Sequence, residues 1–492
     1  MVTQRLGRWV FLRLLGFTYL AAFVSLWVQI DGLVGSRGIL PAADFLDAIA
    51  SQLGPSRYWW LPTLFWIAPS DAMLHALCAG GTILSALLIV GFAPALCLVG
   101  LWVSYVSLTS IGQDFLSFQW DILLCESGFL AIFLAPLSLR PRLAGEADPP
   151  KAIVWLVRWL VFRLMFSSGA VKLLSGDPTW RSLAALDFHY WTQPLPTWIG
   201  WYANLLPPIA QRASCAVMFA IEIGAPLLIW GGAGARRVAL AAFLALQLLI
   251  LVTGNYGYFN LLTIALAVML LDDDAWPERW RRRFTPDAAA VGRAWPKPVV
   301  VAVAALIGLL SVLATFGPGR VGAEWPDPLM TFRRTLAPLR LVGNYGLFAV
   351  MTTERPEITV EGSADGTSWR PYEFRWKPQD PARAPAFVAP HMPRLDWQMW
   401  FAALGRYQQN PWFLAFVLRL LEGSPPVRAL LANDPFPNEP PRYVRATTAS
   451  YTFTGFAERR ETGRWWKIEP RGIYLPVVSL ESFRGRDTEE DR

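Results

Sequence analysis

Residues 298–316 have the sequence PVVVAVAALIGLLSVLATF, a run of 19 residues without a charged side chain. About 20 apolar residues in a helix span the bilayer core, which is about 30 Å thick. Directly after Phe316 the composition changes, and Pro, Arg, Asp and Glu become frequent. This boundary predicts a membrane domain, residues 1–317, followed by a domain outside the bilayer, residues 318–492.

Eight further apolar runs of similar length precede this one. They are residues 9–30, 72–91, 93–111, 120–138, 152–174, 208–230, 237–253 and 256–271. The whole chain is 54% hydrophobic and 16% charged, with a mean hydropathy of +0.34, whereas soluble proteins are about 25% charged. We therefore expect an α-helical polytopic membrane bundle of about nine helices. The same composition excludes a disordered, collagen-like or coiled-coil chain.

The net charge of +7 does not indicate nucleic-acid binding, because the basic residues lie in short clusters between the apolar runs. With a cytoplasmic N-terminus, the cytoplasmic segments carry Arg5, Arg8, Arg140, Arg142, Lys151, Arg236, Arg237, Arg279, Arg281, Arg282, Arg283, Arg293 and Lys297. The opposite loops carry Arg37, Arg57 and Arg181. The positive-inside rule then places residues 318–492 on the outer side.

The compartment follows from one further pattern. The chain has no N-x-[ST] glycosylation sequon, which favours a bacterial membrane over a glycosylating compartment. We expect an integral protein of the bacterial inner membrane with a periplasmic C-terminal domain. In a eukaryote the same topology corresponds to the endoplasmic reticulum membrane with a lumenal C-terminal domain.

The C-terminal 175 residues are expected to form a β-rich domain with a short helical insert. Residues 357–362 and 369–376 alternate in polarity around Asp365-Gly366, which predicts a β-hairpin. Residues 395–405 and 411–422 have helical periodicity, and residues 443–456 and 464–479 alternate like strands. We expect these strands to pack together as one small sheet or sandwich.

Charged residues lie inside the predicted membrane helices, where each costs about 2.5–3.5 kcal/mol at the bilayer centre. They are Glu126, Arg158, Arg163, Lys172 and Glu222. Depth in the bilayer predicts two pairs, Arg163 with Glu222 and Glu126 with Lys172. These pairs either lock helices together, or Lys172 acts as a desolvated base with His189 beside it.

Other chemistry is not indicated. Asp272-Asp273-Asp274 has no spaced His or Cys beside it and is interpreted as the solvated end of a helix rather than a metal site. The chain has three His, and all four Cys fall inside predicted membrane helices. We therefore predict no metal, no cofactor and no disulfide-stabilised domain.

Several motifs in the C-terminal domain resemble the lipase maturation factor family over roughly residues 340–480. They are Asn344-Tyr345-Gly346-Leu347-Phe348, Met351-Thr352-Thr353, Arg355-Pro356-Glu357, Glu361-Gly362-Ser363, residues 372–378 with Trp376, residues 387–391 with Pro390, and residues 393–404 with Pro393 and Gln398. The resemblance implies a membrane-resident folding factor of the endoplasmic reticulum that helps secreted lipases reach their active state. Its partners would be membrane lipid and lipase-like clients.

A second resemblance lies in the helical region. Residues 168–173, Trp180 and His189-Tyr190-Trp191 are similar to a stretch of vitamin K-dependent γ-carboxylase and its bacterial transmembrane relatives, the HTTM proteins. In that family the matching Lys is the catalytic base. This resemblance implies the alternative function, a membrane enzyme that uses Lys172.

The stretch after Pro393 has a physical interpretation of its own, because Pro favours the first turn of a helix. At helical spacing Trp397, Trp400, Phe401 and Leu404 share one face. That face is either core or an aromatic groove for unfolded client segments.

The candidate client contacts are His391, Arg394, Asp396, Trp397 and Trp400. Asp396 is expected to pair with Arg394 or with Arg355. Asn344-Tyr345-Gly346 is interpreted as a turn with positive φ that leads into the first strand.

The two functions make opposite predictions. A non-catalytic maturation factor tolerates Lys172→Ala if it still folds, and loses function when the surface near Trp397 or His391 is changed. A Lys172-dependent enzyme shows the reverse.

Overall fold

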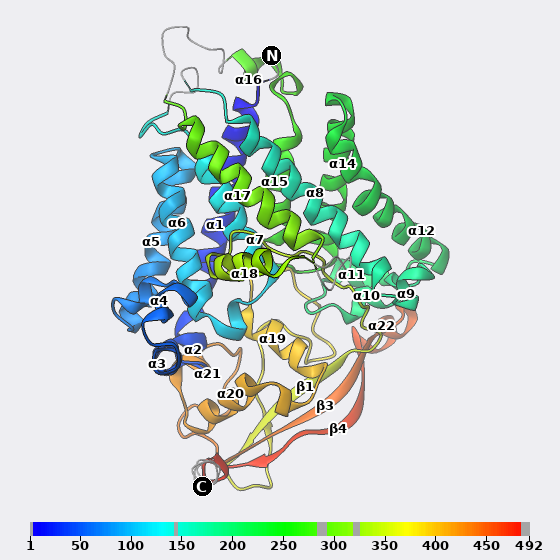
Figure 1. Ribbon diagram of the computed structural model, residues 1–492. Coiled ribbons are helices and arrows are strands. Elements are labelled where there is room, and N and C mark those ends of the chain that lie inside the picture. The colour runs from blue at the N-terminus through cyan, green and yellow to red at the C-terminus, as the bar shows by residue number, and fades with distance from the viewer. Residues whose placement is uncertain (1–2, 142–145, 283–292, 318–324, 484–492) are drawn as a thin grey trace.

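The computed structural model describes residues 3–141, 146–282, 293–317 and 325–483. A bundle of helices occupies one half of the molecule, and an antiparallel sheet with its helices lies below it (Figure 1). The N-terminal end and α16 (Glu278–Arg281) lie at the far end of the bundle from the sheet (Figure 1). The predicted class, a polytopic helical bundle followed by a β-containing domain, is confirmed.

Within the described ranges, seven helices are long and apolar enough to cross a membrane. They are α1 (Arg5–Trp27), α5 (Asp71–Val90), α6 (Pro94–Ile111), α8 (Lys151–Leu174), the segment Pro208–Trp230, α14 (Ala233–Thr253) and α17 (Lys297–Thr315). The segment Pro208–Trp230 consists of α12 (Pro208–Phe219), the π-turn η4 (Ala220–Gly224), α13 (Ala225–Leu227) and η5 (Leu228–Trp230). The chain is therefore an integral multi-pass membrane protein.

Two of the nine predicted runs form shorter helices inside the bundle. They are α7 (Gln119–Leu134) and α15 (Phe259–Ala267), which continues as η6 (Val268–Leu270). Both are almost entirely buried. Their side chains face protein, so they do not need the length that a lipid-exposed helix needs to cross the bilayer.

Local sequence explains where the long helices begin and end. The Ser70 hydroxyl accepts a hydrogen bond from the Met73 backbone N–H at 3.4 Å and caps α5. Gly91 ends α5 with φ at +83°, a left-handed conformation that glycine adopts without strain. Pro94 then begins α6, in the first turn where its missing N–H costs nothing.

Short helices connect the long ones at the end of the bundle nearest the sheet (Figure 1). They are α2 (Ile30–Val34), α3 (Ala42–Leu53), α4 (Arg57–Trp60), α9 (Pro178–Arg181), α10 (Leu186–Thr192), α11 (Trp198–Asn204) and α18 (Asp327–Leu336). The 3-10 turn η2 (Leu64–Trp66) follows α4.

The C-terminal region contains a four-stranded antiparallel sheet of order β2-β1-β3-β4. The strands are β1 (Pro356–Ser363), β2 (Arg370–Pro371), β3 (Tyr443–Phe453) and β4 (Trp466–Val478). The helices here are α19 (Arg394–Ala403), α20 (Pro411–Leu421), α21 (Pro425–Arg428) and α22 (Phe456–Thr462). The predicted hairpin is confirmed, with Glu361 paired to Pro371 and Gly366 at φ +77° in its turn.

α19 lies between the bundle and the sheet (Figure 1). It packs against β1 on one side and against the 3-10 turn η3 (Gln113–Leu116) of the bundle on the other. The family-like motif of residues 393–404 therefore forms the junction between the two halves. The boundary at residue 317 stays a prediction.

Candidate functional site

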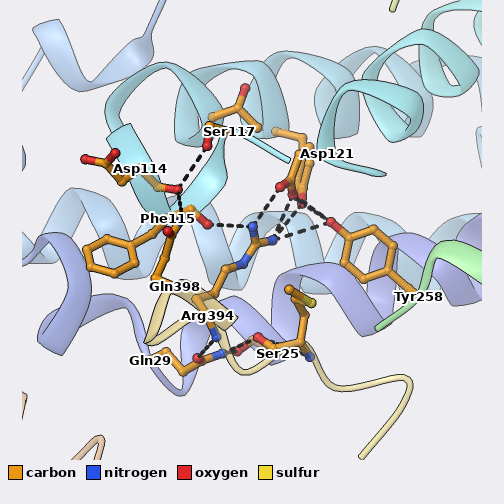
Figure 2. Close-up of polar contacts among 12 residues, drawn as sticks. Ser25, Gln29, Asp114, Phe115, Ser117, Asp121, Tyr258, Arg394 and Gln398 are labelled. Carbon is orange, nitrogen blue, oxygen red and sulfur yellow. Dashed lines mark hydrogen bonds and ion pairs between the residues drawn. The ribbon is translucent and has the colours of Figure 1, made fainter. Parts of the chain in front are cut away.

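A buried ion pair joins α19 to the membrane bundle. Arg394 donates to both oxygens of Asp121 on α7, Nη1 to Oδ2 at 2.7 Å and Nη2 to Oδ1 at 2.8 Å. The hydroxyls of Tyr105 and Tyr258 donate to the same Oδ1 at 2.5 and 2.7 Å. Figure 2 shows the guanidinium enclosed between Asp121, Tyr258 and the Phe115 carbonyl, which accepts from Nη1 at 2.8 Å. The side chains of Arg394 and Asp121 are 1% and 0% exposed.

The end of α1 fixes the backbone that precedes this arginine (Figure 2). The Ser25 hydroxyl accepts from the Met392 N–H at 2.8 Å, and Gln29 Oε1 accepts from the Arg394 N–H at 2.9 Å. Gln29 Nε2 donates to the Met392 carbonyl at 3.0 Å. Polar side chains of the bundle therefore form hydrogen bonds with backbone groups of this loop that would otherwise be buried without partners.

A second buried network holds the start of the C-terminal region. Arg163 on α8 pairs with Glu126 on α7, and the same carboxylate accepts from the Tyr345 hydroxyl and from the Gly343 N–H at 2.8 Å. Gly346 follows with φ at +146°. A Cβ there would lie 2.7 Å from Val171 Cγ1, so this position requires glycine.

Next to this network lies a cavity of about 490 Å³, here called the Lys172 cavity. It is lined by α8, α10, α11, the Pro208–Trp230 segment and α14, and its walls are mostly apolar. Lys172 Nζ donates to Glu222 at 2.7 and 3.0 Å and to the Ser168 carbonyl at 3.1 Å. Three hydrogen-bond contacts therefore hold Nζ against Glu222 and the α8 backbone.

His189, on α10, lines the same cavity. Its Nε2 lies 3.4 Å from the Tyr256 hydroxyl, and its ring packs edge-on against Phe348. Burial, and secondarily the charge of Lys172, lowers the pKa of His189 to about 4. The imidazole is therefore neutral at physiological pH.

A second cavity of about 510 Å³, here called the aromatic groove, opens between α19 and the bundle. Its lining comprises Asp114, residues 117–120, Pro194, Tyr256, residues 346–350, Thr352, Trp397, Gln398, Trp400, Phe401 and Leu404. Trp397 packs edge-on against Trp120 with ring centroids 4.9 Å apart. Phe401 and Leu404 are 42% and 44% exposed.

Tyr256, Leu347 and Phe348 line both cavities and form the wall between them. Phe348 has φ at +53°, a left-handed conformation that is unusual for a bulky side chain. Its carbonyl accepts a hydrogen bond from Trp180 Nε1 at 3.0 Å, which holds this strained residue in place.

The two halves of the chain match two different family models. A family model described as the lipase maturation factor transmembrane domain matches residues 6–278, and one described as the lipase maturation factor C-terminal domain matches residues 341–476. The chain belongs to the lipase maturation factor family. Among its relatives, lipase maturation factor 2 of Mus musculus is 37% identical over 98% of this chain and 84% of the relative.

Other members of the family are similar to this chain over nearly its whole length. Lipase maturation factor 2 of Homo sapiens is 36% identical over 98% of this chain and 84% of its own length. Lipase maturation factor 1 of Bos taurus is 32% identical over 98% and 90%. No solved structure matches the chain. The resemblance stated from the motifs is confirmed, and nothing in these comparisons supports the γ-carboxylase alternative.

The predicted combination of intramembrane charges is wrong. Arg163 pairs with Glu126, Lys172 pairs with Glu222, and Arg158 pairs with Asp272 at 2.9 Å. The prediction used only the position of each charge along its own span. Glu126 lies on α7 and Glu222 lies in η4, and both elements pack against α8. The partner of each charge depends on which turns of these helices meet, and the position along the chain does not determine that.

Most of the predicted client contacts in this family motif are buried. Arg394 and Asp396 are 1% and 3% exposed. Asp396 pairs with neither predicted arginine but accepts from the backbone N–H groups of Trp376 and Lys377 at 2.8 and 2.9 Å. Its carboxylate organises a loop, which explains why the expected ion pair does not form.

The remaining candidates lie in two places, on α19 and just before it. Trp397 and Trp400 line the aromatic groove, and Trp400 Nε1 donates to the Thr192 carbonyl at 2.8 Å. His391 is half-buried and shares a hydrogen bond of 2.9 Å with Ser25. Burial, with the charges of Arg394 and Arg375, lowers the pKa of His391.

Two further parts of the family motifs form contacts within the chain. Arg355 forms a buried ion pair with Glu357 and donates to the backbone carbonyls of Trp191, Gln193 and Pro194. It therefore ties the first strand to the segment between α10 and α11. The predicted turn at Gly346 has its positive φ, but it docks into the bundle rather than leading directly into β1.

Sequence reasoning missed Asp121, Tyr105 and Tyr258. The signal was present, because Asp121 is an acidic residue at the start of the predicted run 120–138. Among the described residues no group of three or more His, Cys, Asp or Glu side chains is placed to hold a metal ion.

Proposed function

We propose that this chain is a membrane-resident maturation factor that helps secreted lipase-like proteins reach their active state. We further propose that the aromatic groove holds apolar segments of the incompletely folded client. Membership of the lipase maturation factor family supports the first statement. The observation that supports the second is an apolar groove of about 510 Å³ whose rim stays exposed beside the family motif.

The groove has the features of a peptide-binding surface. Phe401, Leu404 and Val350 are exposed by 42%, 44% and 65% at its edge, and exposed apolar patches of this kind mark interaction sites. Gln119 and Gln398 in the lining are hydrogen-bonded to the backbone of Gly346 and to the Asp114 carbonyl, so these polar side chains fix the walls of the groove. The Arg394–Asp121 pair beneath keeps the walls rigid, which lowers the entropic cost of binding.

The proposed location follows from the charge distribution. Basic clusters lie in the segments assigned to the cytoplasmic side, and the N-terminal end and α16 lie at the opposite end of the bundle from the sheet (Figure 1). We infer that the C-terminal region faces the periplasm, or the endoplasmic reticulum lumen in a eukaryote. Secreted proteins fold on that side.

The role proposed here is non-catalytic. Lys172 Nζ is held by both carboxylate oxygens of Glu222 and by the Ser168 carbonyl, which are contacts of a structural ion pair. The Lys172–Glu222 pair is better explained as a lock between α8 and the Pro208–Trp230 segment.

The test uses the double variant Phe401→Ser/Leu404→Ser in a host whose own copy of the gene is deleted. The specific activity of a secreted lipase per unit of antigen should fall severalfold compared with the wild-type chain. The matched control is Ile473→Ser/Val477→Ser, because these side chains on β4 are 74% and 52% exposed and lie outside the groove. Equal lipase activity with both variants, at equal membrane abundance, would disprove client binding in the groove.

A further inference from the structure

A basic hollow of about 390 Å³ lies beside α17 and α18 and is separate from both cavities described above. Arg333 and Arg334 on α18 and Arg340 just after it line the hollow. Leu310 on α17 and Leu336 on α18 form part of its apolar wall. Three positive charges therefore meet an apolar surface at one place.

Among the described residues, these arginines have no acidic partners. The lining of the hollow includes no Asp or Glu, and in the described part of the chain no carboxylate lies within 4.0 Å of the three guanidinium groups. Arg340 donates through Nη2 to the Thr109 carbonyl at 3.0 Å, while its Nε is buried without a hydrogen-bond partner. Arg333 and Arg340 are half-buried and Arg334 is exposed. The hollow therefore has a positive potential that attracts an anion.

The hollow lies at the level where the bundle would meet the membrane surface. α17 is one of the candidate membrane spans and ends at Thr315, and α18 lies across its lower end (Figure 1). Trp59 on α4 is 45% exposed and donates to the Thr335 carbonyl of α18 at 2.8 Å. Its neighbours Tyr58 and Trp60 are also exposed. Aromatic side chains gather in this way at membrane interfaces.

We propose that this hollow binds the phosphate headgroup of an anionic phospholipid in the leaflet on the side of the C-terminal region. A guanidinium group can donate two parallel hydrogen bonds to two phosphate oxygens, and Arg333 and Arg334, with the remaining N–H groups of Arg340, supply enough donors for one phosphate. The apolar wall that includes Leu310 and Leu336 receives the first part of the acyl chains. This wall and the position of α18 favour a lipid over free phosphate.

The test measures phosphatidylglycerol binding to the full chain purified in a neutral detergent, with native mass spectrometry as the readout. Phosphatidylcholine, glycerol 3-phosphate and inorganic phosphate are the comparison ligands. The variant is Arg333→Gln/Arg334→Gln, which leaves the hydrogen bond from Arg340 to Thr109 in place. The matched control is Arg370→Gln/Arg442→Gln, two exposed arginines in the sheet region that are not part of the hollow.

We expect the wild-type chain and the control to prefer phosphatidylglycerol over phosphatidylcholine. Each arginine near an anionic surface contributes about a fivefold factor in affinity, so the Arg333/Arg334 variant should bind phosphatidylglycerol about 25-fold more weakly. Equal binding by this variant and the control would overturn the site. Equal occupancy by glycerol 3-phosphate or inorganic phosphate would overturn the lipid as its ligand.

Discussion

The ion pair between Arg394 and Asp121 is the strongest test of how the two halves are joined. Replacing Asp121 with Ala leaves a guanidinium that is 1% exposed without a counter-charge. It also removes the acceptor shared by the hydroxyls of Tyr105 and Tyr258. We expect α19 to lose its attachment to α7.

The size of the effect follows from burial. Removing one partner of a fully buried ion pair costs about 3–5 kcal/mol, because the remaining charge is uncompensated. The docking equilibrium should therefore fall by more than about a hundredfold. Replacing both partners by apolar residues of similar size, Asp121→Leu with Arg394→Met, should recover more than half of this loss, because no charge then remains buried.

The assay is thermal unfolding of the full chain in detergent, followed by tryptophan fluorescence, with limited proteolysis of the C-terminal region alongside it. Trp120 and Trp397 pack 4.9 Å apart across the junction and report on it directly. The control is Glu278→Gln, which breaks a pair exposed by 65% and 77% and should change nothing measurable. If the double variant is as unstable as the two single variants added together, the reasoning from uncompensated charge is refuted.

Three other predictions concern Lys172, His189 and Gly346. Lys172→Ala should destabilise the chain by about 3–5 kcal/mol, because Glu222 stays buried and unpaired, whereas Lys172→Met/Glu222→Leu should fold and keep its lipase-maturation activity. If this double variant folds but gives no lipase activity per unit of antigen, the result would support a catalytic role for Lys172. His189 has a pKa of about 4 in the folded chain against about 6.5 when unfolded, so its contribution to stability is fully present above pH 6.5 and is lost as the pH falls towards 4. His189→Gln should flatten the pH dependence of the melting temperature over that window, and an unchanged slope would contradict the assignment. Gly346→Ala should destabilise the chain by about 1–3 kcal/mol in a denaturation assay, because its φ of +146° disfavours a side chain and the new Cβ would meet Val171, while Gly455→Ala, which has open space around it, serves as the control.

The local features were predictable because each rests on residues close in sequence. The apolar runs gave the helices, and alternation of polarity gave β1, β3 and β4. The turn at Gly366 and the helix after Pro393 follow from the residue types themselves. The family could also be recognised from contiguous motifs. The order of residues in a motif such as residues 393–404 can be read from the sequence without knowledge of the tertiary structure.

The sequence did not predict which charged side chains pair with each other. The carboxylate that Arg394 meets is 273 positions away on α7, and Glu126 meets Arg163 because α7 packs beside α8. Glu222 meets Lys172 because η4 packs against α8. The face of residues 393–404 was interpreted either as core or as an aromatic groove, and only the structure shows that most of the motif is buried between bundle and sheet while Phe401 and Leu404 stay exposed.

The sequence by itself determined that this protein is a multi-pass membrane protein with a β-containing C-terminal region, and which family it belongs to. These properties depend on hydrophobicity and on short-range order along the chain. The tertiary structure alone decided which charges neutralise each other and where the aromatic groove opens. A buried ion pair or a cavity wall is made by elements that approach only after folding, and its energy depends on distance and burial in space.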